Sequence, residues 1–431
     1  MTKVLDKNNS IFKMLIENSV KKPSIKTQKN FFEIIGKIAK LVKKIVDDEK
    51  LIVDLNYDGQ KTWDNAKYFK SCFIDGGIYS SVLSSTAPFA IRAKSYIVQP
   101  NLKINNREKF EETISYIGDL YDPDNTLYDL SEDPYEDNQL ITKKKDAARI
   151  AFETAAIAKH IFDKQKFDYC FLHGPLQTPI MPFSGPEFPL FKESVVKSIL
   201  PFFGNNLKDK SDRHFINVYL KSILYIKDYS KFPVYGVVEK TGSTIYLRNL
   251  FNQSVKKGHI SESERDKLFE TIKRYKINDG NLFELILKDS QALKPIEVEK
   301  QIPSKAWGDW QSQMDSFPKV FISYIKTNQS QSPIRIETLN EPKNFIKDFE
   351  YILATCKLLP NYGFPVGLDI IDKAAKIPSW LGRTAKSYYL KYYLNLAVEN
   401  KDNDQLSNAL KTISKKGRNW DARPKAGGLI R

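Results

Sequence analysis

The stretch KSCFIDGGIYSSVL, residues 70–83, decides how this chain folds. An apolar run at 72–74 leads directly into Asp75 and the pair Gly76-Gly77, after which a β-rich run resumes. Burying a carboxylate in such a run costs free energy unless the carboxylate is paired or binds a metal ion. Glycine inside a strand often marks the close approach of a ligand, or a bulge. The stretch therefore predicts a strand that carries a functional acid, with a simple turn aspartate as the alternative.

The segments around this strand predict an α/β protein. The β-rich runs at 71–83 and 87–99 are separated by Ser84-Ser85-Thr86, which indicates a hairpin. An alanine-rich helix without Gly or Pro is predicted at 143–164, and a short buried strand follows it at 169–172. Later helices are predicted at 212–231, 261–276, within 362–382 and at 384–400, and later strands at 232–239, 244–248, 319–326 and 332–339. This order predicts a mixed sheet, with parallel and antiparallel neighbours, flanked by helices.

The two ends of the chain and one internal stretch differ from this pattern. Up to about Lys50 the sequence predicts a helical N-terminal arm, because its apolar residues recur mostly at three- and four-residue spacing. We expect this arm to pack on the body of the protein rather than on a second copy. Residues 119–137 combine many carboxylates with two prolines, which predicts an exposed acidic loop. The basic, glycine-rich tail at 415–431 is expected to stay flexible unless a partner orders it.

Composition narrows the class of protein. The chain has 431 residues and a formal net charge of +15. Such a surplus favours polyanionic partners such as nucleic acid, and a solvated basic surface is the alternative. The three cysteines are scattered without a C-x-x-C pair, which fits a reducing compartment and argues against a disulfide framework or a zinc site. Without a signal-peptide core or a long apolar run, the sequence predicts a cytoplasmic protein with no membrane span.

Four residues from separate segments are candidates for one site. Asp75 comes from the first strand, and Glu153 lies on a largely apolar helical stripe, where an ion pair with Arg149 at i, i+4 is an equal alternative. His173 ends a buried strand, where a lone histidine is usually structural. Asp372 lies on a C-terminal helix one turn after Asp369, so either of these two acids could face inward.

The combination of these residue types favours a metal site. Hard divalent cations such as Mg²⁺ and Mn²⁺ prefer oxygen ligands, and carboxylates also balance their charge. Two such ions can activate a water molecule and stabilise the leaving oxygen of a phosphodiester. The sequence has no P-loop, G-x-S-x-G, H-E-x-x-H or paired C-x-x-C motif, so the common NTPase, hydrolase and zinc classes have no support.

Four segments, taken in order, resemble the NurA nuclease family. They are FIDGGIYSS, RIAFETAAIAK, YCFLHGPL with FPVYGVVEKTGS, and SPIRIETL with the later YGFPVGLDIIDKAAKI. The resemblance runs from about residue 70 to about residue 390, and it lies in the order and spacing of short motifs. It implies an RNase H-like core, cleavage of DNA that depends on Mn²⁺ (or Mg²⁺), a homodimer, and docking on a HerA-type hexameric ATPase in DNA end processing or anti-phage defence.

The resemblance also implies roles by position. Asp75 and Glu153 match the first two metal-binding acids of the family, and Asp372 falls where the family places a late metal-site residue, commonly Asp or His. His173 is a departure, because the family strand normally ends in Asp followed by Gly. A neutral imidazole can ligate Mn²⁺, but it removes one negative charge from the site. Either the site works with a histidine, or this chain has weakened or lost cleavage.

We therefore predict a NurA-like core at 70–390, preceded by the helical arm at 1–69 and followed by a C-terminal helix and basic tail at 391–431. Arg149 and Lys240 are predicted phosphate contacts, although Lys240 could equally be an ordinary turn lysine. One rival hypothesis is a non-catalytic DNA-binding or scaffold subunit that keeps the fold and the partner surface. A second rival is an RNA-directed or guide-binding module on the same fold.

Overall fold

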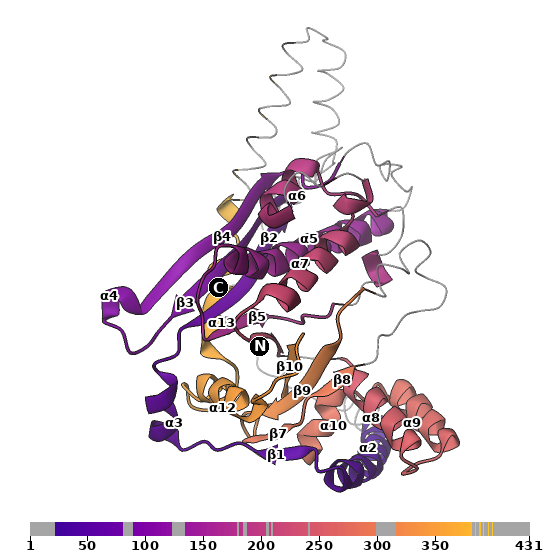
Figure 1. The fold of residues 1–431 in the computed structure, drawn as a ribbon. Coiled ribbons are helices and arrows are strands. Elements are labelled where there is room, and N and C mark those ends of the chain that lie inside the picture. Colours follow the sequence, from indigo (N-terminus) through magenta and orange to yellow (C-terminus); the bar gives the residue numbers. More distant parts are fainter. Residues whose placement is uncertain are drawn as a thin grey trace, which may run out of the picture. The chain divides into compact units, whose positions relative to one another are not determined.

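The computed structural model separates into two compact units, which are described one at a time (Figure 1). The first unit comprises Met1–Lys67, Tyr235–Lys300 and Lys319–Val366, and the second comprises Tyr68–Val234, Gln301–Pro318 and Gly367–Arg431. The structure describes residues 22–80, 89–122, 134–178, 181–183, 188–203, 207, 210–239, 242–298, 316–381, 384, 388, 391, 395 and 399. The side chains of 22–30, 134–140, 181, 203 and 210 are outside this description.

The second unit contains an RNase H-like arrangement of four strands. Strand β2 (Ser71–Ser80) pairs antiparallel with β3 (Phe89–Val98), and β3 pairs antiparallel with β4 (Glu108–Gly118). On its other edge β2 pairs in parallel with β5 (Tyr169–His173). The order is therefore β5-β2-β3-β4. The hairpin and the mixed pairing expected from the sequence are confirmed, whereas β4 was not predicted.

A long helix makes the crossover between these strands. Helix α5 (Pro134–Phe162) connects β4 to β5 and packs on β2 and β3. Parallel neighbours need such a connection, because a tight turn can join only antiparallel strands. The face of α5 that packs is rich in alanine, and its short side chains allow the helix to approach the sheet closely. Further helices of this unit are α4 (Ile104–Arg107), α6 (Glu193–Ile199), α7 (Phe215–Tyr229) and most of α13 (Val366–Ala375). The described residues 379–381, 384, 388, 391, 395 and 399 are also helical, as predicted for 384–400.

The first unit has its own antiparallel strands. Their order is β1-β7-β9-β10-β6, and β8 also pairs with β9. These strands are β1 (Ile52–Asp54), β6 (Val234–Val238), β7 (Gln291–Leu293), β8 (Ile296–Val298), β9 (Val320–Lys326) and β10 (Ile334–Thr338). The helices are α2 (Lys22–Asp48), α3 (Gly59–Ala66), α8 (Ile245–Lys256), α9 (Glu262–Tyr275), α10 (Asp279–Ile286) and α12 (Phe345–Cys356).

The N-terminal helix is amphipathic, as the sequence predicts. Five of its apolar residues are buried: Ile35, Ile38, Val42, Ile45 and Val46. Helix α2 packs against α10 of the same unit, so the expectation that the arm packs on the body is confirmed. In the described part of the chain, no helix has the length and apolar content needed to cross a membrane.

Two local predictions were wrong. Residues 245–256 form helix α8, whereas we predicted a second strand at 244–248. The short β-rich run there is overridden by its context: Tyr246, Leu247, Leu250 and Phe251 are buried on one helical face. The predicted acidic loop at 119–137 is also too long, because α5 begins at Pro134. Proline is tolerated at the first position of a helix, where its missing N–H would have no partner anyway.

Candidate metal centre

The two glycines after Asp75 open both faces of strand β2. Successive side chains of a strand point to opposite faces, so Asp75 and Gly77 share one face and Gly76 lies on the other. A Cβ added at Gly76 would lie 2.7 Å from Glu153 Oε1 of α5. A Cβ added at Gly77 would lie 1.9 Å from the carbonyl oxygen of Ala375, at the end of α13. The absence of side chains therefore lets α5 and α13 approach the backbone on either side of the acid.

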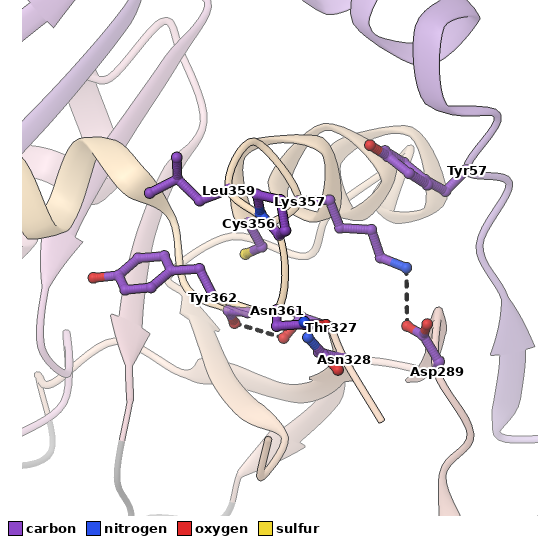
Figure 2. A pocket seen from close by; sticks show the side chains of 11 residues that line it. Tyr57, Asp289, Thr327, Asn328, Cys356, Lys357, Leu359, Asn361 and Tyr362 are labelled. Carbon is purple, nitrogen blue, oxygen red and sulfur yellow. Dashed lines mark hydrogen bonds and ion pairs between the residues drawn. The ribbon is translucent and has the colours of Figure 1, made fainter. Parts of the chain in front are cut away.

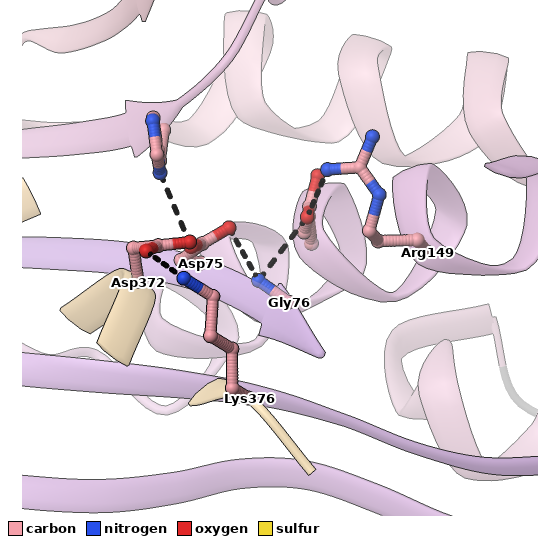
Figure 3. A network of polar contacts seen from close by, with 7 residues as sticks. Asp75, Gly76, Arg149, Asp372 and Lys376 are labelled. Atoms are coloured by element: carbon pink, nitrogen blue, oxygen red, sulfur yellow. Dashed lines mark hydrogen bonds and ion pairs between the residues drawn. The ribbon is translucent and has the colours of Figure 1, made fainter. Parts of the chain in front are cut away.

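Three potential metal ligands converge on the face that carries Asp75. One ligand atom from each of Asp75, His173 and Asp372 can be chosen so that all three lie within 4.8 Å of one another. Phe73 and Phe171 are register partners in the parallel strands β2 and β5. Asp75 lies two residues after Phe73 and His173 two residues after Phe171, so both side chains point to the same face of the sheet. Its Nδ1 is 3.1 Å from Asp75 Oδ2. Figure 3 shows Asp75 and Asp372 next to one another.

Glu153 contacts the same piece of backbone from the other face of β2. The amide of Gly76 lies 2.8 Å from Asp75 Oδ1 and 3.1 Å from Glu153 Oε1, so one N–H serves two carboxylates. Arg149 Nη1 donates to Glu153 Oε1 at 3.0 Å (Figure 3). The ion pair with Arg149 expected at i, i+4 is therefore present, whereas the group of converging ligand atoms comprises Asp75, His173 and Asp372 without Glu153. The metal-binding role of Glu153 stays a prediction.

Burial and neighbouring charges shift the protonation of this cluster. Burial raises the pKa of Glu153 to about 8, against the opposing effect of the Arg149 charge, and the negative charge of Asp75 adds to the rise. For His173, burial lowers the pKa, but the hydrogen bond and charge of Asp75 outweigh it and leave the pKa above its usual value. The two shifts differ in cause, because burial raises the pKa of Glu153 whereas for His173 burial is outweighed by Asp75. In both, the negative charge of Asp75 raises the pKa, and the carboxylates of Asp75 and Glu153 repel one another. A cation placed among them would relieve that repulsion.

Three basic residues on the Asp75 face were missed in the sequence analysis. Lys376 Nζ donates to Asp372 Oδ2 at 2.6 Å. Lys94 is the register partner of Asp75 in the β2–β3 hairpin, and Arg92 is the register partner of Gly77. Opposite residues in a hairpin share a face, with Cβ atoms roughly 5 Å apart. In a hairpin centred between Ser84 and Ser85, residues at equal distances before and after the turn are opposite one another. The sequence alone could therefore have paired Asp75 with Lys94 and Gly77 with Arg92.

The structure places two of the remaining residues, Asp369 and Arg149, but does not describe Lys240. Asp369 pairs with Lys373 at 2.7 Å and does not belong to the group formed by Asp75, His173 and Asp372. This answers which of the two helical acids faces the site. Arg149 lies beside Glu153, with its side chain 38% exposed. Lys240 lies outside the described residues, so its predicted phosphate contact stays a prediction.

The first unit contains a separate pocket of about 240 Å³ (Figure 2). Lys357 points toward Asp289, to which it donates at 2.9 Å, and also lies 5.0 Å from the ring centre of Tyr57. The volume is below the usual range of ligand sites, about 300–1,000 Å³. Because the ammonium of Lys357 is already paired with Asp289, it is poorly placed to bind an anionic ligand in this pocket. None of its lining residues belongs to the cluster around Asp75.

Comparisons with solved structures find NurA nucleases among the matches. The crystal structure of the NurA nuclease from Sulfolobus solfataricus matches with a TM-score of 0.50 at 14% identity, covering 90% of this chain and 97% of that chain. A structure of NurA bound to dAMP and manganese matches with a TM-score of 0.43 at 11% identity, covering 83% of this chain and 94% of that chain. A structure of NurA with manganese gives 0.41 at 10% identity, covering 84% and 98%. The comparison with curated proteins gives no match.

The family comparison is decisive. The model of the NurA domain matches residues 69–377, which is well over half of the chain. The matched region includes all four residues singled out as candidates, with the strands β2 and β5 and the helices α5 and α13 that carry them. The resemblance stated from short motifs is therefore confirmed, and this chain belongs to the NurA family.

Proposed function

We propose that this chain is a metal-dependent DNA nuclease that hydrolyses phosphodiester bonds. The family supports a NurA-like nuclease. The observation that carries the proposal is the convergence of Asp75, His173 and Asp372, whose ligand atoms lie within 4.8 Å of one another. The net charge of +15 suits a polyanionic substrate.

The donor set fits a hard or borderline divalent cation. Two carboxylates and one imidazole suit Mn²⁺, and the carboxylates alone would suit Mg²⁺. Asp75, His173 and Asp372 would hold the ion, and Glu153 is close enough to the same backbone to contribute to its charge balance. A divalent ion bound there supplies an activated water molecule and stabilisation of the leaving oxygen.

The other charged residues of the site orient ligands and hold the substrate. Arg149 keeps the buried carboxylate of Glu153 in place and leaves part of its guanidinium exposed for a phosphate. Lys94 and Lys376 add positive charge on the face of Asp75, where a phosphate would approach. Lys240 is retained as a proposed phosphate contact from the sequence alone.

The histidine at 173 changes the charge of the site but leaves a working ligand set. An aspartate there would bring a third carboxylate to the group, whereas the imidazole brings a nitrogen ligand without negative charge. Asp75 and Asp372 still supply two carboxylates, which is enough to balance one divalent ion. We therefore propose an active enzyme rather than an inactive copy.

Cleavage assays test this proposal directly. The purified chain is incubated with linear double-stranded, single-stranded and plasmid DNA in Mn²⁺, in Mg²⁺ or in EDTA. Cleavage in Mn²⁺ that EDTA abolishes is the expected result. Binding of DNA without cleavage under any metal condition would favour the rival, a non-catalytic DNA-binding or scaffold subunit. Tighter binding of RNA than of DNA in a competition assay would instead favour the RNA-directed rival.

The assembly follows the family and is part of the same proposal. We infer that the chain forms a homodimer, acts in the cytoplasm and docks on a HerA-type hexameric ATPase that delivers DNA to the site. DNA end processing and anti-phage defence are both compatible with such a complex. Light scattering of the purified chain measures its oligomeric state. Co-purification with a HerA-type ATPase, if one is encoded nearby in the genome, tests the partner, and a monomer that fails to bind it would contradict this assembly.

A further inference from the structure

The C-terminal end of α13 is held by one arginine of strand β3. Arg92 Nε donates to the carbonyl oxygen of Ala375 at 2.9 Å, and Arg92 Nη2 donates to those of Ala374 at 2.9 Å and Lys376 at 2.6 Å. The last carbonyls of a helix lack intrahelical partners and carry the negative end of the helix dipole. A guanidinium that binds three of them supplies both the missing hydrogen bonds and the opposite charge.

The same helix end rests on a bare piece of backbone. Gly77 is the register partner of Arg92 and lies on the same face of the hairpin. Any Cβ at this position would lie 1.9 Å from Ala375 O and 2.7 Å from Ala375 C, which forces backbone to move rather than a flexible side chain. We call Arg92 and Gly77 together the helix-end socket. One member binds the end of α13 by hydrogen bonds, and the other lets it approach the strand.

Asp372 and Asp75 both lie close to the socket in sequence. Asp372 lies three residues before Ala375, roughly 4.5 Å along the helix axis at 1.5 Å per residue. Asp75 lies two residues before Gly77, roughly 7 Å along the strand. Both acids thus lie only two or three residues from the contact between Ala375 and Gly77, and their ligand atoms lie within 4.8 Å of one another.

We propose that Arg92 is a positioning residue, which acts with Gly77 to hold Asp372 in the metal-binding group. This proposal rests on the metal centre of the proposed function. Arg92 does not itself contact Asp75, His173 or Asp372 in the described contacts, and its Nε and Nη2 are already used by the three carbonyls. Its effect is therefore transmitted through the backbone of α13 to a single ligand.

The first test measures Mn²⁺ binding by electron paramagnetic resonance, with no DNA present. Arg92→Gln should weaken Mn²⁺ affinity by about 10- to 100-fold, the range found for outer partners of metal ligands. Arg92→Lys should recover part of the loss, because one ammonium can satisfy fewer carbonyls. The matched control is Arg107→Gln, which removes an exposed arginine of the same unit that also donates to a carbonyl oxygen. This control should bind Mn²⁺ like the parent chain.

A double-mutant cycle separates positioning from general destabilisation. If Arg92 acts through Asp372, Arg92→Gln should have little further effect on Mn²⁺ affinity in an Asp372→Asn background. Additive losses, or an unchanged affinity in the folded Arg92→Gln variant, would overturn the proposal. Circular dichroism checks the fold, and Gly77→Ala provides a second variant that disturbs the other member of the socket.

Hydrogen exchange keeps this inference distinct from the proposed function. The amides of residues 366–376 should exchange faster in Arg92→Gln than in the parent, with or without metal. If the parent binds no Mn²⁺ but exchange still accelerates, the metal centre is wrong and the socket stands. If exchange across this helix is unchanged, the socket is wrong even when the parent binds Mn²⁺.

Discussion

Two buried aspartates, one in each unit, differ in what surrounds them. Asp279 in the first unit is 1% exposed and accepts hydrogen bonds from the amides of Tyr246 and Leu247 and from the hydroxyl of Tyr324. Asp75 in the second unit is 4% exposed. Its oxygens lie close to one amide and one imidazole, and Asp372 lies beside it.

This is the difference expected between a structural acid and the metal ligand that we propose. Three neutral donors surround Asp279, two of them from the first turn of α8, so its carboxylate also compensates a helix N-terminus. Asp75 and Glu153 share a single backbone amide, and Asp372 lies beside Asp75, an arrangement that a bound cation would stabilise. A buried carboxylate alone is weak evidence for a functional site, whereas carboxylates from separate segments that converge on one point are stronger evidence.

The largest expected effect compares these two acids directly. Asp75→Asn should lower DNA cleavage by at least about 100-fold, since even outer partners of metal ligands have effects of that order. Asp279→Asn should leave cleavage by the folded protein close to that of the parent, because no ligand depends on it. Rates of plasmid cleavage in Mn²⁺, corrected for the folded fraction, provide the measurement. Equal losses in the two variants would remove the distinction between the two acids.

The second prediction concerns the dependence of stability on pH. Burial raises the pKa of Asp279 from 3.8 to about 7, against the hydrogen bonds that favour its charge. The protonated form is therefore favoured in the folded state, and its contribution is full below pH 4 and is lost as the pH rises through 7. A shift of about 3 units corresponds to about 4 kcal/mol of unfolding free energy over this range.

Asp279→Asn should remove most of that slope, since the amide does not titrate. Urea unfolding between pH 4 and 8 measures the free energy of unfolding for both proteins. The pKa of Glu153, which burial raises to about 8, gives a slope of the same sign, but there Mn²⁺ should restore stability at high pH. A slope that persists in Asp279→Asn with Mn²⁺ present would show that Asp279 is not its source.

The third prediction concerns His173, whose imidazole contacts Asp75. His173→Asp replaces a nitrogen ligand by an oxygen ligand and adds a negative charge, so the balance between metals should move toward Mg²⁺. We expect cleavage in Mg²⁺ to rise about tenfold relative to cleavage in Mn²⁺. His259→Asp, which makes the same change in the first unit, should leave the ratio unchanged.

Three outcomes of this substitution have different meanings. A rise in the absolute rate with Mn²⁺ would show that the histidine had weakened the enzyme, and a fall would show that it is a tuned ligand. An unchanged ratio of the two metals would show that residue 173 does not bind the ion.

The sequence predicted the parts of this fold that depend on local pattern. The strand with Asp75, the hairpin, helix α5 and the ordering of the candidate segments follow from periodicity and turn residues. Residues 245–256 were misassigned because a short β-rich run resembles a strand until its buried helical face is known. The choice between Asp369 and Asp372 could not be made from spacing, since the two lie one turn apart. The roles of Gly77 and Arg92 depend on α13, which is distant in sequence and meets them only after folding.

The smallest expected effect concerns Asp369, the acid that spacing could not exclude. Its carboxylate pairs with Lys373 at i, i+4, with the lysine side chain 70% exposed. Pairs of this kind contribute about 0.3–0.5 kcal/mol, and they are weakened further by salt. Asp369→Asn should therefore change Mn²⁺ affinity less than about twofold, whereas Asp372→Asn should weaken it by an order of magnitude or more. Because both substitutions remove one negative charge from the same helix, a comparable loss in both would mean that net charge, rather than the position of Asp372 beside Asp75, attracts the cation.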